Sequence, residues 1–371
     1  MAATQLPSFQ RAVQQDENGQ PRVVSKASIP SLPSGFALVK TYAVALNPSD
    51  HKILHNFPIP GGYIGSDFSG TVVQTADDVN TDILKPGTMV SGAAFNFAPT
   101  HRKVNGAFAE YVRAPVDLLL RVSPPSSTHK DTMGPLEAAT LATAISTCIL
   151  AFWSPDALGL LGTLDAPVHH EKPIPVLVYG GSTATGTIAV QLLRMSGYDP
   201  IATCSPRNFD LVRDRGASAV FDYSTPDVAI KIKTHTNGRL KYVLDCISDA
   251  DSVSICYAAI QRAGGRCALL ERVPDELLAT REAVRSAFVL AADIYGEDIT
   301  LGQRGYDRPA SREKHELAVQ HLGAVQRLLD QGRLKAHPIE VLDGGLQGAV
   351  KGLEILANGQ VSGKKLVAII G

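Results

Sequence analysis

The sequence predicts an α/β protein in which a doubly wound parallel sheet is joined to a β-rich unit. Two patterns support this prediction. Between residues 9 and 121, short β-rich runs alternate with Gly and Pro turns, which is typical of an all-β or barrel-like unit. From Pro175 onward, apolar strands alternate with amphipathic helices, which is typical of a parallel sheet that binds ligands at the carboxyl ends of its strands.

The predicted elements follow these patterns along the chain. In the β-rich unit we expect strands within 36–46, 68–75, 87–95, 106–114 and 117–122. A helix over 135–152 and a linker over 169–175 follow. The parallel sheet is expected to contain strands within 176–180, 200–204, 219–223, 242–246 and 266–270, with helices within 184–196, 209–216, 227–236 and 251–265 between them. After a polar loop that runs through Pro309, we expect helices over 312–330 and 346–357 and a final strand over 364–370 that returns to the first domain.

Composition limits the class of protein further. The chain has 371 residues, of which 44% are hydrophobic, so it can bury the cores of more than one domain. A net charge of −1 gives no reason to expect binding to nucleic acid or to an acidic membrane surface. The longest apolar stretch, 141–153, is too short to cross a bilayer, and residues 1–20 lack a signal-peptide pattern. Five scattered Cys residues fit reduced thiols. We therefore expect a cytoplasmic protein.

The stretch 176–198 contains the strongest local motif. A buried strand is predicted to meet a tight turn and then a helix from Ala184, with Gly181, Thr183 and Gly186 at the spacing of the dinucleotide fingerprint. Thr183 replaces the middle glycine. A helix N-terminus binds phosphate, and we expect the hydroxyls of Ser182, Thr183 and Thr185 to add donors there. The alternative is an ordinary turn from strand to helix.

The end of the next predicted strand indicates which cofactor is bound. An NAD site would place an acid about 20 residues after the fingerprint, against the ribose 2′-hydroxyl. Here the chain has Ser205, Arg207 and Asn208, which suit a 2′-phosphate. The sequence therefore predicts NADPH. The alternative for Arg207 is a solvated loop cation.

Several motifs together resemble one family over nearly the whole chain. They are ALNPSDHK, YIGSDFSGTVV, ISTCILAF, VYGGSTATGTIAVQLLRMSGY, PIATCSPRNFDLVRDRGA, FDY, AAIQRAGG and VSGKKLV. The chain resembles the medium-chain dehydrogenase/reductase superfamily and, within it, the trans-acting enoyl reductases of fungal polyketide synthases, such as the lovastatin enoyl reductase. The resemblance implies a GroES-like catalytic domain over 1–165, a Rossmann domain over 166–300 and a return to the catalytic domain over 301–371.

The resemblance also addresses zinc. Zinc alcohol dehydrogenases of this superfamily place a Cys in the segment aligned with ALNPSD and a His-Glu pair in the segment aligned with YIGSDFSG. Here those segments offer Asn47, Pro48 and Ser49, then Ser66 and Asp67. Adjacent histidines at 169–170 are expected to be exposed loop residues. A catalytic zinc needs three protein ligands, so no metal is expected.

The implied reaction is hydride transfer from NADPH to the β-carbon of an α,β-unsaturated thioester. The resulting enolate needs donors for its oxygen and a proton for its α-carbon. Lys52 is implied to position the cofactor and to stabilise charge, with a surface lysine as the alternative. His51 could supply a proton, or be an exposed histidine. Thr147 is implied to contact nicotinamide or substrate, and otherwise lies in a helix interior.

The resemblance implies two larger sets of contacts. The cofactor residues are Ser49, Asp50, His51, Lys52, Ser182, Thr183, Ala184, Thr185, Ser205, Pro206, Arg207, Asn208, Tyr223, Leu270, Glu271, Val361 and Ser362. The substrate residues are Thr147, Cys148, Ile149, Leu150, Ala151, Phe152, Trp153, Ser154, Ala291, Ala292, Asp293, Ile294 and Tyr295. Tyr223 would stack near adenine, or else be a core aromatic at a strand end.

The implied partner is an acyl carrier protein or its polyketide synthase, with or without a peptide synthetase module, acting in trans on a monomeric reductase. Two other functions stay open. One is a free-standing NADPH quinone or enone reductase. The other is an NADPH-binding sensor or structural protein without turnover, a use that the fold also tolerates.

Overall fold

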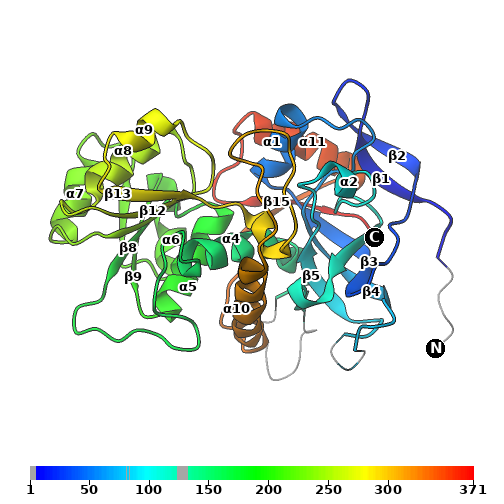
Figure 1. Ribbon diagram of the computed structural model, residues 1–371, viewed down its shortest axis with the longest axis horizontal. Helices are drawn as coiled ribbons and strands as arrows, with labels where there is room; N and C mark the ends of the chain where they lie inside the picture. Colours follow the sequence, from blue (N-terminus) through cyan, green and yellow to red (C-terminus); the bar gives the residue numbers. More distant parts are fainter. Residues whose placement is uncertain (1–5, 81, 83, 123–132) are drawn as a thin grey trace. The chain divides into compact units, whose positions relative to one another are not determined.

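The computed structural model describes residues 6–80, 82, 84–122 and 133–371 (Figure 1). The chain forms two compact units, each assembled from separated parts of the sequence. Unit 1 contains Met1–Thr143, Tyr295–Ser311 and Gln326–Gly371, and unit 2 contains Ala144–Ile294 and Arg312–Val325.

Unit 1 is built on a seven-stranded sheet. Its strands are β3 (Phe36–Ala45), β4 (Asp67–Thr75), β5 (Met89–Ala93), β6 (Tyr111–Pro115), β7 (Leu120–Arg121), β14 (Ile339–Leu342) and β15 (Lys365–Ile369). Their order is β14-β15-β3-β4-β5-β7, and β6 also pairs with β3. The last strand, β15, runs antiparallel to β3 and pairs Val367 with Ala45. This pairing confirms that the final strand returns to the first part of the chain.

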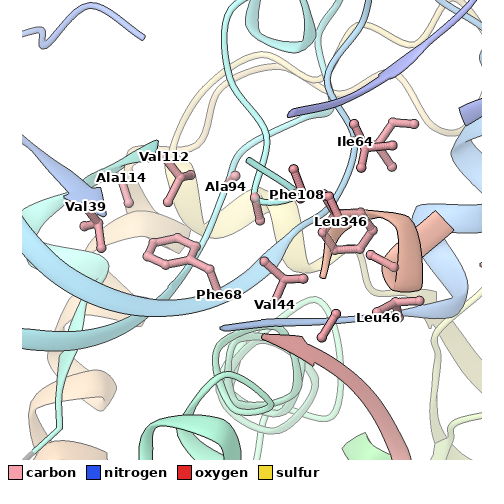
Figure 2. Close-up of a cluster of buried hydrophobic side chains, with 14 of the residues drawn as sticks. Val39, Val44, Leu46, Ile64, Phe68, Ala94, Phe108, Val112, Ala114 and Leu346 are labelled. Carbon is pink, nitrogen blue, oxygen red and sulfur yellow. The ribbon is translucent and has the colours of Figure 1, made fainter. Parts of the chain in front are cut away.

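Apolar side chains on this sheet form the core of unit 1. Figure 2 shows Phe68 of β4 and Val44 of β3 among the buried side chains of the cluster, which also includes Phe108 and Leu346. The remaining elements of unit 1 are β1 (Gln10–Gln15), β2 (Pro21–Ala27), α1 (Pro48–Asn56), α2 (Pro99–Arg102), the 3₁₀ turn Val116–Leu118, α3 (Pro135–Ala138) and α11 (Leu346–Ala357). Helix α1 was not predicted as an element. It begins at Pro48, where the fixed φ of proline suits a first helical turn.

The single helix predicted over 135–152 is wrong, because the structure has two helices there. Helix α3 ends at Ala138, and α4 (Ala142–Trp153) begins after a short turn. The backbone carbonyl and N–H groups that lose helical hydrogen bonds at this break have partners elsewhere in unit 1. The carbonyl of Thr140 accepts a hydrogen bond from Lys365 Nζ, and Asp67 Oδ1 accepts from both the backbone N–H and the hydroxyl of Thr143. Partners of this kind allow a helix to stop without unpaired polar groups.

Unit 2 contains the predicted parallel sheet. Its strands are β8 (Pro175–Tyr179), β9 (Asp199–Cys204), β10 (Ala219–Asp222), β11 (Tyr242–Asp245), β12 (Gly265–Leu269) and β13 (Val284–Phe288). All of them pair in parallel, in the order β10-β9-β8-β11-β12-β13. From β8 the chain adds strands toward one edge of the sheet, and from β11 it adds them toward the other edge. This order confirms a doubly wound sheet. In such sheets the ligand lies at the carboxyl ends of the strands that flank the reversal.

Helices complete unit 2. They are α5 (Ala184–Met195), α6 (Phe209–Asp214), α7 (Val228–His235), α8 (Ala250–Ala259), α9 (Asp275–Ala279) and the 3₁₀ turns Pro206–Asn208 and Ala291–Tyr295, together with most of α4 and the first part of α10 (Arg312–Asp330). One buried cluster packs Leu177, Ile201 and Val243 of the sheet with Ile232 of α7 and Val253 of α8. No helix in the described ranges is long and apolar enough to span a membrane.

The compact units and the domain limits expected from the sequence divide the chain differently. Residues 144–165 and 312–325 belong to unit 2, whereas the sequence limits place them outside the central domain. The limits 1–165, 166–300 and 301–371 remain our proposal for the family domains, since compactness and family descent divide a chain by different criteria.

Candidate active site

The loop between β8 and α5 brings backbone unusually close to backbone. A Cβ atom at Gly186 would lie 2.3 Å from the carbonyl oxygen of Gly180, and one at Gly181 would lie 2.7 Å from the Cβ of Ala202. Side chains do not fit at either position. Both glycines of the fingerprint are therefore required, as the sequence predicts, and the N-terminus of α5 lies directly against the turn.

The threonine in the middle of the fingerprint caps helix α5. Thr183 has φ −76° and ψ 164°, an ordinary extended conformation that does not need glycine. Its hydroxyl accepts from the N–H of Gly186 at 2.9 Å and donates to the carbonyl of Gly180 at 2.8 Å. In this structure the proton of the hydroxyl is directed into the loop, and its donation to a phosphate stays a prediction. The hydroxyl fixes the shape of the turn.

The residues predicted at the ribose end of the cofactor lie together in unit 2. Asn208 Nδ2 donates to Ser182 Oγ over 3.3 Å, and the hydroxyls of Ser205 and Tyr223 are 3.2 Å apart. The Tyr223 side chain is 42% exposed, so its alternative as a core aromatic is wrong. Arg207 is exposed and makes no hydrogen bond or ion pair with any residue that the structure describes. Its guanidinium is available to an anion.

A buried aspartate that the sequence analysis missed shapes the neighbouring loop. Asp245, at the end of β11, is fully buried and accepts hydrogen bonds from the N–H groups of Ile247 and Ser248 and from the Ser252 hydroxyl. Burial raises the pKa of its carboxyl. Ser248 Oγ in turn accepts from the N–H of Leu270, a predicted cofactor residue. The signal in the sequence was the pattern of an aspartate at a strand end followed three residues later by serine. The side chain of Glu271 accepts from the next N–H, that of Arg272.

In unit 1, α1 carries the predicted residues 49–52. Asp50 is 1% exposed, and its carboxylate accepts from the N–H of Asn47 and the hydroxyl of Ser66, each at 2.8 Å. Burial is the largest of the effects that raise the pKa of Asp50 to about 6. His51 is half-buried, and its pKa is lowered by burial and then by His55 and Lys52. The Lys52 side chain is exposed.

The pKa of Asp50 gives a testable pH dependence. The folded protein holds this proton up to about pH 6, whereas an unfolded carboxyl loses it near 3.8. The contribution to stability is therefore complete below pH 3.8 and is lost as the pH rises through 6. At about 1.4 kcal/mol for each pH unit, Asp50→Asn should gain on the order of 2–3 kcal/mol relative to wild type between pH 4 and pH 7.

The measurement is the free energy of unfolding of both proteins by urea at several pH values. The charges that face Asp50 are Asp67, which opposes its ionisation, and Lys365, which favours it, and both stay in place in the variant. Parallel stability curves for the two proteins would contradict the assignment.

Among the predicted substrate residues, those of α4 are buried. Thr147 is 7% exposed, while residues 148–154 are each 6% exposed or less. Cys148 Sγ lies 3.8 Å from the carbonyl oxygen of Thr185. Trp153 donates from Nε1 to the carbonyl of Gly162 at 2.8 Å and stacks on His321 with ring centroids 4.0 Å apart. These contacts within unit 2 explain why the Trp153 ring is buried.

The second predicted substrate segment, Ala291–Tyr295, ends unit 2 at Ile294 and continues into unit 1 at Tyr295. Side-chain contacts fix it in each unit. In unit 2, Lys314 of α10 pairs with the buried Asp293 at 2.8 Å, and His315 Nδ1 lies 2.8 Å from the carbonyl oxygen of Ile294. In unit 1, the hydroxyl of Tyr295 donates to the carbonyl of Ala93 at 2.6 Å. The predicted cofactor residues Val361 and Ser362 precede β15, and Ser362 is exposed.

Comparisons with known proteins first define the class. Residues 33–124 match the family model described as "Alcohol dehydrogenase GroES-like domain", and residues 184–280 match that described as "Zinc-binding dehydrogenase". Solved structures of the same fold include a putative zinc-dependent alcohol dehydrogenase from Rhizobium etli (TM-score 0.72, 23% identity, 97% of this chain and 98% of that one) and the CurK enoyl reductase (TM-score 0.69, 16% identity, 98% and 99%). The chain is an oxidoreductase of the medium-chain dehydrogenase/reductase class.

Curated relatives then define the family within this class. The trans-enoyl reductase TwmE of Talaromyces wortmannii is 65% identical over 100% of both chains. The trans-enoyl reductase buaC of Petromyces alliaceus is 42% identical and covers 98% of this chain and 97% of its own. The protein belongs to the fungal trans-enoyl reductases, as its motifs predicted.

The class name implies zinc, but the residues present do not fit it. In the two segments where zinc relatives carry ligands, this chain has Asn47, Ser66 and Asp67. The ammonium of Lys365 lies between two of them, 2.6 Å from Asp67 Oδ2 and 2.9 Å from Asn47 Oδ1. A dication would have to displace this buried cation. In the described part of the chain, no three His, Cys, Asp or Glu side chains are grouped as metal ligands.

Proposed function

We propose that the protein transfers hydride from NADPH to the β-carbon of α,β-unsaturated polyketide thioesters carried by the acyl carrier protein of a partner polyketide synthase. The observation that carries the proposal is the 65% identity, over the full length of both chains, to a protein named trans-enoyl reductase. The partner synthase, with or without a peptide synthetase module, would act in trans in secondary-metabolite biosynthesis.

The residues present fit NADPH. The close approach at Gly186 leaves the N-terminus of α5 open to a diphosphate, and the capped turn fixes it there. The exposed Arg207 and the neighbouring hydroxyl of Ser205 suit a 2′-phosphate. An Asp or Glu at this position, as in an NAD site, would repel that phosphate. The fold neighbour described as mycobacterial Rv1454c was solved in complex with NADPH, at 19% identity and a TM-score of 0.69 over 97% of this chain and 99% of that one.

Arg207→Ala is therefore expected to raise the dissociation constant for NADPH about tenfold and to leave that for NADH nearly unchanged, because only NADPH offers the 2′-phosphate. The measurement is titration calorimetry with both cofactors. Arg213→Ala is the matched control, since Arg213 is another exposed arginine of unit 2, and its guanidinium pairs with Asp210 and lies over the Phe209 ring. Equal losses for NADPH and NADH would contradict the cofactor assignment.

The chemistry requires three things of the chain. Bound NADPH supplies the hydride. The chain's residues must then hold the unsaturated thioester in line, provide donors to the enolate oxygen and allow a proton to reach the α-carbon. We assign charge stabilisation and cofactor positioning to Lys52 and contact with nicotinamide or substrate to Thr147. His51 is a candidate proton source. Burial lowers its pKa, so its ring would take up a proton from solvent before passing it to the α-carbon.

Lys52→Ala and Thr147→Ala are each expected to lower kcat for an enoyl thioester at least tenfold, Lys52 because it stabilises developing charge and Thr147 because it positions the reacting groups. Steady-state turnover of NADPH at saturating thioester is the measurement. Lys85→Ala, at an exposed lysine of unit 1 outside the proposed site, is the control. Wild-type turnover in either variant would remove that residue from the site.

For α4 we limit the proposed substrate contacts to fewer residues. Cys148 and Trp153 have contacts inside unit 2 that explain their burial. We therefore propose Thr147 as the principal contact from this helix, and residues 149–152 and Ser154 as the packing that supports it. From the second segment we propose Ala291 and Ala292 as contacts for the acyl chain because their side chains are small, whereas Asp293 is paired with Lys314.

The function is tested by NADPH consumption with three acceptors: an enoyl pantetheine thioester, the matching free enoic acid and a simple quinone. Selective turnover of the thioester would support the proposal. Selective turnover of the quinone would assign the protein to the general quinone and enone reductases. If NADPH binds tightly but none of the three acceptors is reduced, a sensor or structural role would replace the enzymatic one.

A further inference from the structure

A buried cation is the centre of a hydrogen-bond network in unit 1. Lys365, at the start of β15, has a side chain that is 4% exposed. Its ammonium contacts Asp67 Oδ2 at 2.6 Å, Asn47 Oδ1 at 2.9 Å and the carbonyl oxygen of Thr140 at 3.4 Å. An ammonium has three N–H donors, and these contacts supply three acceptors. The position of the lysine head is thus fixed from three sides.

Asp67 is held just as completely. Its Oδ2 accepts from Lys365 and from Asn47 Nδ2 at 3.0 Å, and its Oδ1 accepts from the N–H and the hydroxyl of Thr143 at 2.8 and 2.7 Å. A carboxylate offers about four lone-pair sites, and four donors reach it here. The network therefore does not require water or a further ion to be satisfied.

The network ends on the residue that starts α1. Asn47 is the N-cap of this helix, and three of its atoms are fixed: Oδ1 by Lys365, Nδ2 by Asp67, and the backbone N–H by Asp50. The proposed cofactor residues Ser49 to Lys52 follow within the first five residues of the helix, which begins at Pro48. The direction in which this part of the helix presents its side chains thus depends on where Asn47 is held.

Stability alone is a weak reason for such a pair. Apolar side chains of similar volume often replace a buried ion pair without loss of stability, so charge of this kind is better explained by the arrangement that it specifies. Leu46 and Leu366, the neighbours in sequence of Asn47 and Lys365, are already joined by a backbone hydrogen bond of 3.0 Å. The side-chain network adds a fixed orientation to that pairing.

We propose that Lys365 is a positioning residue for the cofactor: through Asp67 and Asn47 it sets the orientation of the first turn of α1 and of residues 49–52. The inference rests on the proposed function, because residues 49–52 are cofactor residues only under that proposal. In this proposal Lys365 does not contact the cofactor or the thioester. It affects cofactor binding only through the position of Asn47.

The test uses the double variant Asp67→Asn/Lys365→Met, which removes both buried charges together. The new amide can still accept from Thr143, and the Asn47 amide can rotate to pair with it. The expected result is folded protein whose dissociation constant for NADPH, measured by nicotinamide fluorescence, rises at least fivefold. KM for NADPH should rise with it, while KM for the thioester changes less than twofold. Lys364→Met is the matched control, since that neighbouring lysine is exposed and pairs with Glu340 at the surface.

A second variant tests the same inference with the ion pair intact. Asn47→Ala removes the link between Lys365 and α1 but leaves Asp67 paired with the ammonium, and it should weaken NADPH binding to a similar degree. Wild-type affinity in either folded variant would overturn the proposal, as would a loss of binding that only follows the loss of folded protein. A wild-type protein that binds NADPH but does not reduce the thioester would refute the proposed function alone, because the affinity measurements would still test the positioning role.

Discussion

Lys365→Met alone is expected to lower the free energy of unfolding by about 3–5 kcal/mol, the usual cost of leaving one member of a buried ion pair without its partner. Asp67 is fully buried, and without the ammonium its carboxylate keeps only the donors of Asn47 and Thr143. Methionine matches the length of the lysine stem, so the change removes charge and hydrogen bonds with little change in packing.

Urea denaturation followed by circular dichroism at pH 7 measures this loss. Two comparisons make it specific. Lys364→Met should change stability by less than about 0.5 kcal/mol, as is usual for an exposed side chain, and Asp67→Asn/Lys365→Met should recover most of what the single variant loses. A single variant as stable as wild type would mean that water or a proton replaces the ammonium beside Asp67.

The elements predicted correctly from the sequence are those whose signal is local. Strands β8, β9 and β11 are short apolar runs between turns, and α5 has both helical periodicity and a glycine stop. The return of β15 to the first part of the chain followed from a β-rich run after a helix at the end of the sequence. For the three strands and the helix, neighbouring residues determine the structure, so a single sequence is sufficient to predict it. The pairing of β15 with β3 is long-range and was expected only from the place of the strand at the end of the chain.

The split between α3 and α4 could not be predicted in this way. Residues 135–152 have continuous helical character, and the partners that satisfy the break at Thr140 and Thr143 come from Asp67 and Lys365. Lys365 lies 225 residues beyond Thr140, where it is the second of two lysines before an apolar run. Nothing in that run distinguishes the buried Lys365 from the exposed Lys364. The distinction depends on which side of β15 meets β3.

The candidate site shows the same division. The fingerprint glycines were predicted because the turn, the strand and the helix are contiguous. The direction in which the Thr183 hydroxyl donates was not predicted, because it depends on the carbonyl of Gly180, whose position is set by the fold of the loop. Asp245 and its loop were missed for a related reason: an aspartate at the end of a strand is common, and its burial is decided by Ser252 and by the neighbouring strands.

The second large effect is expected at the loop of unit 2. Gly186→Ala should raise the dissociation constant for NADPH about 100-fold, because the diphosphate would lose hydrogen bonds to the displaced N–H groups, and a bond to a charged group contributes about 1.5–3 kcal/mol. The added Cβ would lie 2.3 Å from the carbonyl oxygen of Gly180 and 2.8 Å from the Cα of Gly181. Both are backbone atoms, so the turn and the start of α5 must separate. The separation also breaks the cap that Thr183 provides, and we expect it to cost about 1–3 kcal/mol of stability.

Binding and stability can be separated with one control. Ala189→Gly, at a fully buried position further along α5, should lower stability by about 1 kcal/mol or more through loss of helix propensity but leave the turn intact. Trp153 is the single tryptophan of the chain and belongs to unit 2, so its fluorescence reports the unfolding of this unit directly. If the two variants are equally destabilised and only Gly186→Ala loses NADPH, the close approach of the turn to α5 holds the cofactor. If NADPH affinity falls in both variants in proportion to their loss of stability, the loop contributes only by keeping unit 2 folded. The diphosphate must then be held elsewhere.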